Sequence, residues 1–254
     1  MIPKIIHYCW LSNEPFPKEI AKYIDTWKKN LPDYEFIKWD FTRINKADFP
    51  WVAEAFDRKK YAFAADFIRV YALYNYGGIY LDSDVEVLKS FNDLLSHPYF
   101  MCHEYKNTVI EAAVIGAKKN HPFFEKMLHY YDDRHFIKEN GGMDQRTLPS
   151  ITEEIIKNNF VLQEIKNPNE IDNADESKIC VLPYDFFSPK STVSGKIDKT
   201  RNTYAIHHFS NTWFPWYYRI EKKFWHLFHV KNMKLILRCV NLVKHGSIRG
   251  RIFD

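Results

Sequence analysis

Two aspartates separated by a single residue, Asp82 and Asp84, are the side chains whose type and spacing best suit chemistry. They follow a short apolar run, Ile79 to Leu81, which is typical of a strand buried on both faces. Ligands of open α/β sheets bind beyond the carboxyl ends of the strands, so the pair is expected at a binding edge. Such carboxylates suit Mg²⁺ or Mn²⁺ bridged to a substrate phosphate. The alternative is a polar strand end that caps the next turn.

A helix and a glycine turn are expected to position this strand. Apolar residues recur at helical spacing from Ala62 to Leu73. Gly77-Gly78 should end the helix, because glycine tolerates the left-handed backbone of a C-cap. Asp66 and Arg69 lie three residues apart and share one helix edge. They form either an exposed ion pair of little energetic weight or part of a substrate site. The alanines and aromatic residues around them favour the site.

The whole unit resembles the sugar-transferase signature of glycosyltransferase family 32. The pattern Ala-Phe-x-x-Asp-x-x-Arg-x-x-x-Leu-Tyr-x-x-Gly-Gly-Ile-Tyr-Leu-Asp-x-Asp runs from Ala62 to Asp84. That family includes the yeast initiating mannosyltransferases and bacterial capsule and lipopolysaccharide enzymes, and the stretch is also similar to the core of the clostridial glucosylating toxins. Looser similarity extends over most of residues 1 to about 215. The resemblance implies an α/β fold, a GT-A type, Rossmann-like domain that binds a nucleotide sugar.

The first 40 residues are predicted to form a βαβ unit. Strands are expected at residues 2–10 and 34–39 with a helix at 17–30 between them. His7 and Trp10 fall near the end of the first strand, and Asp40 follows the second. The resemblance implies that all three belong to the donor pocket, with Trp10 stacking on the base and Asp40 near the ribose. The alternatives are core packing for Trp10 and a turn-capping role for Asp40.

The resemblance also assigns donor-binding roles inside and after the Asp-x-Asp unit. Asp66 would accept hydrogen bonds from sugar hydroxyls, Arg69 would contact the sugar or phosphate, and Ser83 would line the donor site. A double glycine precedes Asp144 and Gln145, which would face the donor sugar. Asp144 would bind sugar hydroxyls or stabilise positive charge at the anomeric carbon. The alternative for Asp144 is an N-cap aspartate.

A strand at residues 204–213 is expected to deliver two histidines, His207 and His208, close to Thr212 and Trp213. Neutral imidazole suits Mn²⁺, and the resemblance implies one C-terminal residue that completes the metal shell. Adjacent strand residues point to opposite faces, so only one histidine should be the ligand. His208 is preferred, and His207 remains the alternative. Thr212 and Trp213 would hold the terminal phosphate of the leaving nucleotide.

Further strands are predicted at residues 100–104 and 112–117, and a helix at 118–132. Gly116 is expected to permit close approach of the substrate to the backbone. His121 precedes a proline suited to the first turn of the helix, and it is interpreted as structural.

Charge is distributed unevenly along the 254 residues. The net charge is +4, yet residues 219–254 alone carry nine Lys or Arg against two Asp or Glu. Apolar residues recur there at helical intervals, which predicts a basic amphipathic helical C-terminal extension after a transferase domain at 1–218. The extension either touches an anionic membrane through residues 219–251 or packs on the domain. Nucleic-acid binding is not expected, because this basic face is no aromatic-lined groove.

The four cysteines show no metal-ligand or redox spacing and are expected to be buried thiols in a reducing compartment. No signal peptide and no run of about 18 apolar residues is apparent. The sequence therefore predicts a bacterial cytoplasmic protein, at the inner face of the cytoplasmic membrane if the extension binds lipid.

Together these features predict a metal-dependent, retaining glycosyltransferase. A sugar would move from a UDP- or GDP-sugar to a growing glycan or lipid-linked glycan, such as capsule, O-antigen or lipooligosaccharide. Asp82, Asp84 and Asp144 form the predicted catalytic set, and Mn²⁺ or Mg²⁺ held by Asp82, Asp84 and His208 would neutralise the leaving diphosphate.

Three points stay open at this level. Front-face attack and double displacement are both possible, since the sequence identifies no covalent nucleophile. A metal-dependent nucleotide-sugar hydrolase is the first alternative function, although no nucleophile elbow, P-loop or second metal cluster is apparent. A non-catalytic sugar-binding protein on the same fold is the second alternative.

Overall fold

The structure is a computed structural model that describes residues 1–12, 14–107, 109–173 and 175–210. Its centre is a five-stranded sheet in the order β2-β1-β3-β6-β5. The strands are β1 (Ile5–Cys9), β2 (Glu35–Trp39), β3 (Gly78–Leu81), β5 (Tyr99–Phe100) and β6 (Val114–Ala117).

Strand direction brings three carboxyl ends to the same edge of this sheet. β1 pairs in parallel with both β2 and β3, whereas β3 with β6 and β6 with β5 are antiparallel pairs. The residues that follow β1, β2 and β3 therefore lie side by side. That edge carries the segments that begin at Trp10, Asp40 and Asp82.

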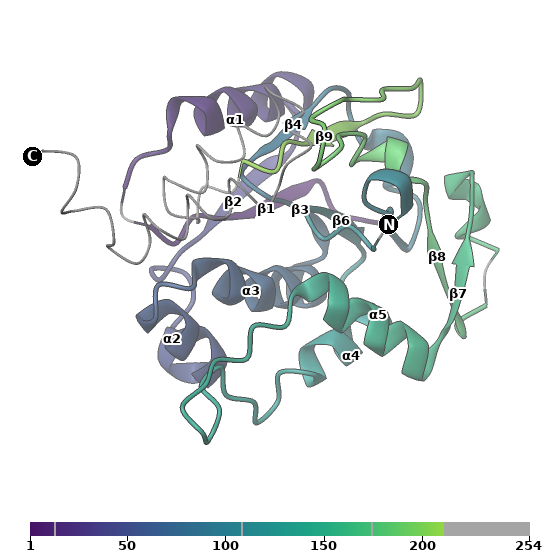
Figure 1. Ribbon diagram of the computed structural model, residues 1–254. Coiled ribbons are helices and arrows are strands. Elements are labelled where there is room, and N and C mark those ends of the chain that lie inside the picture. Colours follow the sequence, from purple (N-terminus) through teal and green to yellow (C-terminus); the bar gives the residue numbers. More distant parts are fainter. Residues whose placement is uncertain (13, 108, 174, 211–254) are drawn as a thin grey trace, which may run out of the picture.

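Helices cover both faces of the sheet (Figure 1). On one face lies α1 (Lys18–Asn30), which contacts the small ribbon of β4 (Val85–Val87) and β9 (Ala205–His207). On the other face α3 (Tyr61–Tyr76) contacts β1, β3 and β6, and the remaining helices pack beyond it. These are α2 (Pro50–Asp57), α4 (Pro122–His129) and α5 (Leu148–Asn159), and a separate parallel pair is formed by β7 (Val161–Glu164) and β8 (Lys178–Val181).

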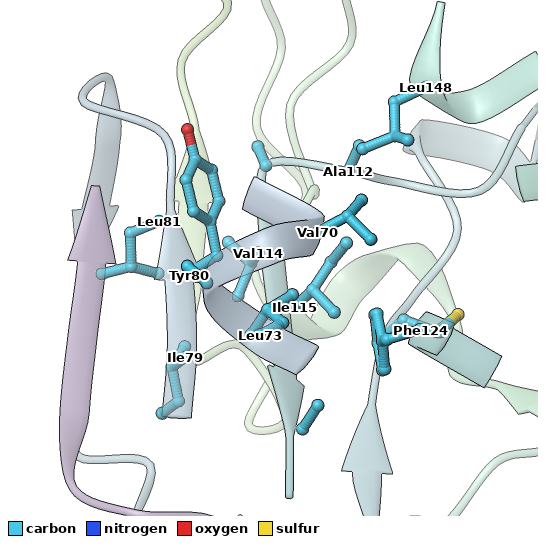
Figure 2. Packing of buried hydrophobic residues seen from close by; sticks show 14 of the residues in the cluster. Val70, Leu73, Ile79, Tyr80, Leu81, Ala112, Val114, Ile115, Phe124 and Leu148 are labelled. Carbon is cyan, nitrogen blue, oxygen red and sulfur yellow. The ribbon is translucent and has the colours of Figure 1, made fainter. Parts of the chain in front are cut away.

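The helix α3 is buried on most of its circumference because it is the middle layer. Val70 and Leu73 are fully buried between the sheet and the outer helices, as Figure 2 shows beside Ile79, Ile115 and Phe124. Since the helix lacks a wide solvent face, polar side chains on it need partners inside the protein. Arg69 is one of these, with 5% of its surface exposed.

Most of the predicted elements are confirmed, and the α/β class with them. The helix predicted at 17–30 lies at Lys18–Asn30, and Gly77 ends α3 at a φ of 67° while its N–H donates to the carbonyl of Leu73. Several boundaries differ. The strands predicted at 2–10, 100–104 and 112–117 are reduced to Ile5–Cys9, Tyr99–Phe100 and Val114–Ala117, and the helix predicted at 118–132 covers only Pro122–His129.

Gly116 does not have the predicted role of admitting a substrate. A Cβ atom built on it would lie 2.2 Å from a ring carbon of Phe100, the neighbouring strand's residue. The glycine is needed because the aromatic ring occupies the space above its backbone. The prediction was wrong because sequence alone does not reveal which side chain crosses a strand glycine.

Cys9, Cys102 and Cys180 are buried free thiols, as predicted. Among the residues described, no helix is long and apolar enough to cross a membrane. The predicted boundary at residue 218 and the predicted extension at 219–254 lie outside the described residues.

Candidate metal and donor site

Asp82 and Asp84 lie in the tight turn that joins β3 to β4. The N–H of Asp82 donates to the Ala113 carbonyl at 2.9 Å, and the N–H of Val85 donates to the Asp82 carbonyl at 3.0 Å. The first bond continues the pairing of β3 and β6 by one residue beyond Leu81 and Val114, and the second closes the turn. Backbone bonds therefore fix the positions of both carboxylates.

The third member of the cluster comes from the far end of the chain. β9 pairs antiparallel with β4 so that His207 lies opposite Val85. This pairing places one ligand atom each of Asp82, Asp84 and His207 within 4.8 Å of one another. His207 Nε2 lies 3.5 Å from Asp84 Oδ1. Asp84 Oδ2 accepts a hydrogen bond from the Ser210 N–H at 2.7 Å.

His208 points away from this cluster, so the preference for it as the metal ligand was wrong in this geometry. Its Nε2 lies 2.8 Å from Glu86 Oε2, and its ring stacks on Tyr23 with the centroids 4.3 Å apart. Strand alternation is the physical reason: His207 is the last residue of β9 and His208 follows it directly, so their side chains point to opposite faces. Alternation limits the metal site to one of the two histidines, but it does not determine which side the aspartates occupy.

Arg69 connects α3 to the Asp-x-Asp turn. One guanidinium nitrogen donates to Asp82 Oδ1 at 2.8 Å and lies 3.5 Å from Asp66 Oδ1. The other terminal nitrogen donates to the Ala112 carbonyl, and the group lies over the Tyr80 ring at 4.4 Å. Arg69 thus orients Asp82 directly. Its contact with the donor sugar or phosphate remains a prediction.

The electrostatics of the cluster reflect carboxylates packed closely in the protein interior. Burial raises the pKa of Asp82, although Arg69 opposes this effect. Burial would also raise the pKa of Asp84, but attraction to His207 and its hydrogen bonds outweigh burial and lower it. Burial tends to lower the pKa of His207, yet Glu111 and Asp84 raise it well above its usual value.

These residues fit a divalent metal ion. Two carboxylates and one imidazole form the oxygen–nitrogen donor set that Mn²⁺ accepts, and Mg²⁺ uses carboxylates with phosphate oxygens. The clustered negative charge, with Asp82 and Asp84 one residue apart, would be offset by a cation. Asp82, Asp84 and His207 are therefore the residues that would hold it.

Trp10 and Asp40 lie together beyond the ends of β1 and β2. The backbone N–H of Trp10 donates to the Trp39 carbonyl at 3.2 Å, and the centroid of its ring lies 4.7 Å from that of Phe16. Asp40 accepts from the Thr42 hydroxyl at 2.6 Å, and this bond and Lys38 lower the pKa of Asp40 to about 2. Both are partly exposed. Their donor-binding roles remain predictions, and Asp40 also fills the turn-capping role weighed against them.

His7 does not reach the edge of the sheet. It is fully buried, its Nε2 lies 2.7 Å from the Gly77 carbonyl oxygen, and its Nδ1 accepts from the Trp39 indole at 3.1 Å. Both ring nitrogens are used inside the core, so the donor-binding prediction for His7 was wrong. Alternation along β1 is again the reason, because the residue faces α3 rather than the strand end.

Asp66 and the loop before α5 meet beside Arg69. Asp66 Oδ2 accepts from the Leu148 N–H at 3.3 Å, and burial raises the pKa of Asp66 to about 6. Asp144 is buried in that loop, where its side chain accepts from the Arg146 N–H, and Gln145 is exposed. No contact described joins Asp144 or Gln145 to the metal cluster, so their sugar-binding roles remain predictions.

Ser83 is half-buried between the aspartates, whereas Thr212 and Trp213 lie outside the described residues. Sequence reasoning missed Glu111, which lies 3.0 Å from His207 and is 2% exposed. The signal in the sequence was the position of Glu111, a single acidic residue directly before the apolar run that starts at Ala112.

The segment that contains this edge is similar to known proteins. A family model described as a glycosyltransferase sugar-binding region containing a DXD motif matches residues 17–101, a range that includes Asp82 and Asp84. The chain is 36% identical over 129 residues to inositol phosphoceramide mannosyltransferase 3 of Schizosaccharomyces pombe, over 48% of this chain and 35% of that protein. The resemblance drawn from the Ala62–Asp84 pattern is thereby confirmed.

Other relatives have related names. The chain is 32% identical over 144 residues to mannosyl phosphorylinositol ceramide synthase SUR1 of Saccharomyces cerevisiae, over 54% of this chain and 37% of that protein. It is 36% identical over 151 residues to a glycosyltransferase, L373, of Acanthamoeba polyphaga mimivirus, over 56% and 59% respectively. The chain thus spans between about a third and three fifths of the lengths of these relatives.

Among solved structures, the chain is similar to one named PaToxG Glycosyltransferase. The superposition has a TM-score of 0.46 and 21% sequence identity, and it covers 62% of this chain and 69% of the other.

Proposed function

We propose that the protein transfers a sugar from a nucleotide diphosphate donor with the help of a divalent metal ion, since residues 17–101 match the model of a glycosyltransferase sugar-binding region that contains a DXD motif. The single observation that carries this proposal is the cluster of Asp82, Asp84 and His207 at the carboxyl end of β3. The cluster lies at the edge where α/β sheets bind ligands.

Each residue of the site would have a separate role. Asp82, Asp84 and His207 would hold Mn²⁺ or Mg²⁺, which supplies Lewis-acid stabilisation of the diphosphate as it leaves. Arg69 keeps Asp82 in place from inside the fold. Asp66, whose side chain is 16% exposed, is the carboxylate next to Arg69 that would accept hydrogen bonds from the donor sugar. Trp10 and Asp40 would receive the base and the ribose.

The acceptor we propose is a hydroxyl of a glycan or lipid-linked glycan. Two of the relatives are named for transfer of mannose to a phosphoinositol ceramide lipid, which supports a mannosyl donor and a lipid-linked acceptor as the first substrates to test. UDP- and GDP-sugars both remain candidates. Bacterial surface glycans remain candidate acceptors on the strength of the family 32 resemblance.

A donor-binding experiment tests this proposal. Melting temperatures would be measured with UDP- and GDP-sugars, each with Mn²⁺ or with EDTA, because a ligand that binds only the folded state raises the melting temperature. We expect a shift with one donor that requires the metal and is lost in Asp84→Asn. A shift that is equal in EDTA would contradict metal-dependent binding.

Product analysis separates transfer from hydrolysis. With the donor identified, release of the nucleotide should increase when an acceptor is added, and the sugar should be found on the acceptor. Asp82→Asn and Asp84→Asn should each lower turnover by roughly 10²–10³-fold, the usual effect of removing an electrostatic stabiliser. Nucleotide release that is independent of any acceptor would favour the hydrolase.

A further inference from the structure

We propose that Glu111 is a positioning residue that holds His207 in the one orientation and tautomer able to bind a divalent cation beside Asp82 and Asp84. The inference rests on the proposed metal site and adds to it a residue outside the ligand set. Glu111 contacts neither aspartate side chain in any described hydrogen bond, and its direct contact with the cluster is the one with His207.

Both carboxylate oxygens of Glu111 are committed to separate tasks. Oε2 lies 3.0 Å from His207 Nδ1. Oε1 accepts the backbone N–H groups of Ala112 and Ala113, each at 2.8 Å. Two backbone donors on one oxygen prevent the carboxylate from rotating, so Oε2 is fixed toward the histidine. The side chain is 2% exposed, so bulk solvent has little access to it.

This arrangement determines which nitrogen of His207 carries hydrogen. An ionised carboxylate only accepts hydrogen bonds, so Nδ1 must be the donor. In the neutral ring the lone pair then belongs to Nε2, the nitrogen 3.5 Å from Asp84 Oδ1. Carboxylate–histidine pairs of this kind fix the tautomer and ring orientation of metal-binding histidines.

The same short segment also orients the other side of the cluster. The Ala113 carbonyl accepts from the Asp82 N–H, and the Ala112 carbonyl accepts from Arg69, which in turn donates to Asp82. Residues 111–113 thus connect to Asp82 through the backbone and to His207 through Glu111. A change at Glu111 that preserves the backbone bonds should leave the hydrogen bonds of Asp82 intact and alter the contact with His207.

Glu111→Gln is such a change. The amide oxygen would have to face the two backbone N–H groups, because the amide NH₂ cannot accept them. The NH₂ would then face His207 Nδ1, which must become the acceptor, and Nε2 would carry the hydrogen. A protonated Nε2 cannot bind a metal ion. The variant has the same shape as the original but favours the wrong tautomer.

Mn²⁺ affinity is the measurement that tests the inference, by electron paramagnetic resonance of free Mn²⁺ or by calorimetry. We expect Glu111→Gln to bind Mn²⁺ about 10–100-fold more weakly, the range found for second-shell partners of metal ligands. Glu54→Gln is the matched control, since Glu54 also pairs with a histidine Nδ1, that of His135, and accepts the Ile137 N–H. It should bind Mn²⁺ like the unmodified protein.

The outcomes are distinct. Mn²⁺ binding by Glu111→Gln within twofold of the unmodified protein would overturn the inference while leaving the metal site intact. If the unmodified protein does not bind Mn²⁺, the proposed metal site itself fails and the inference falls with it.

A second measurement does not depend on the variant folding. Nitrogen-15 NMR of the unmodified protein with diamagnetic Cd²⁺ should show hydrogen on His207 Nδ1 and metal on Nε2, and the reverse assignment would overturn the proposal.

Discussion

Largely buried charge is the property that the site residues share. The carboxylates of Asp66, Asp82, Asp84 and Glu111 surround two basic side chains, Arg69 and His207. Charges out of water are costly unless they are paired, and removing one partner of such a set leaves another charge uncompensated. The excess of carboxylates is offset when a divalent cation binds. Metal binding and the local stability of this cluster should therefore be coupled.

The two adjacent histidines should respond differently to substitution. His207→Asn removes one of three candidate ligands, and we expect Mn²⁺ affinity to fall at least about tenfold. His208→Asn removes a contact with Glu86 and Tyr23 instead, so affinity should stay within about twofold. Calorimetric titration of both variants with Mn²⁺ checks this. The reverse result would restore His208 as the ligand.

The core residue His7 should make folding stability depend on pH. Burial lowers the pKa of His7 to about 4, against about 6.5 in an unfolded chain. The unfolded state therefore binds more protons between these values. The stabilising contribution of His7 is complete above pH 6.5 and is lost as pH falls toward 4, by up to about 3 kcal/mol.

Urea unfolding of the unmodified protein and of His7→Gln at pH 7.5 and pH 5 checks this expectation. The unmodified protein should be the more stable at pH 7.5, and the difference between the two should shrink at pH 5. Burial also lowers the pKa of His121 to about 4. Since both proteins contain His121, its contribution to the pH dependence of stability is the same in both and cancels in the difference. Parallel pH dependence in the two proteins would contradict the assignment.

At the scale of elements, the site depends on two strand contacts that are close in space and distant in sequence. β3 supplies the aspartates, and its partner β6 is preceded by Glu111. β4 continues from the turn and pairs with β9, which ends at His207. The helix α3 lies beneath and contributes Arg69. The ligand set is thus assembled by sheet pairing rather than by a single loop.

The packing of β5 on β6 should be sensitive to Gly116. Gly116→Ala would place a methyl group 2.2 Å from the Phe100 ring, and overpacking of this kind costs about 1–3 kcal/mol. The free energy of unfolding should fall accordingly. Adding Phe100→Leu should recover part of the loss, since the two positions are in contact.

The single variant Phe100→Leu completes this double-mutant cycle as its control. Additive effects of the two substitutions would show that the glycine has another function.

At the scale of the whole molecule, a lipid-linked acceptor of the kind proposed would be reached at a membrane surface. The basic residues of 219–251 lie outside the described part, and the proposal that they touch an anionic membrane comes from their sequence pattern. Each Lys or Arg near such a surface contributes about 1 kcal/mol, and the attraction is screened by salt.

Vesicle sedimentation with the full chain tests the membrane proposal. Binding to vesicles rich in phosphatidylglycerol should exceed binding to neutral vesicles and should weaken with salt. Replacing four basic residues of the extension with glutamine should lower the affinity roughly 10²–10³-fold; these are Lys222, Lys223, Lys231 and Lys234.

Four exposed lysines elsewhere give a control of equal charge: Lys28, Lys29, Lys138 and Lys157. Equal losses in the two variants would indicate a general charge effect and contradict a specific role for the extension.

What the sequence determined by itself was local. The hydrophobic spacing of residues 62–73, the Gly77-Gly78 stop and the apolar run before Asp82 specify a helix, a turn and a strand, because each depends on neighbouring residues only. The same pattern carried the family resemblance, and with it the prediction of a metal site at a strand end.

Only the tertiary structure decided which distant residues complete the site. Strand alternation limits each histidine to one of two faces, but which face meets Asp84 depends on the register of β9 against β4. The same holds for His7, which is turned into the core, and for Gly116, whose space Phe100 fills. Glu111 belongs to no sequence motif. It matters because sheet pairing brings it into contact with His207, which lies 96 residues further along the chain. Long-range register is a property of the packed molecule, and no local pattern encodes it.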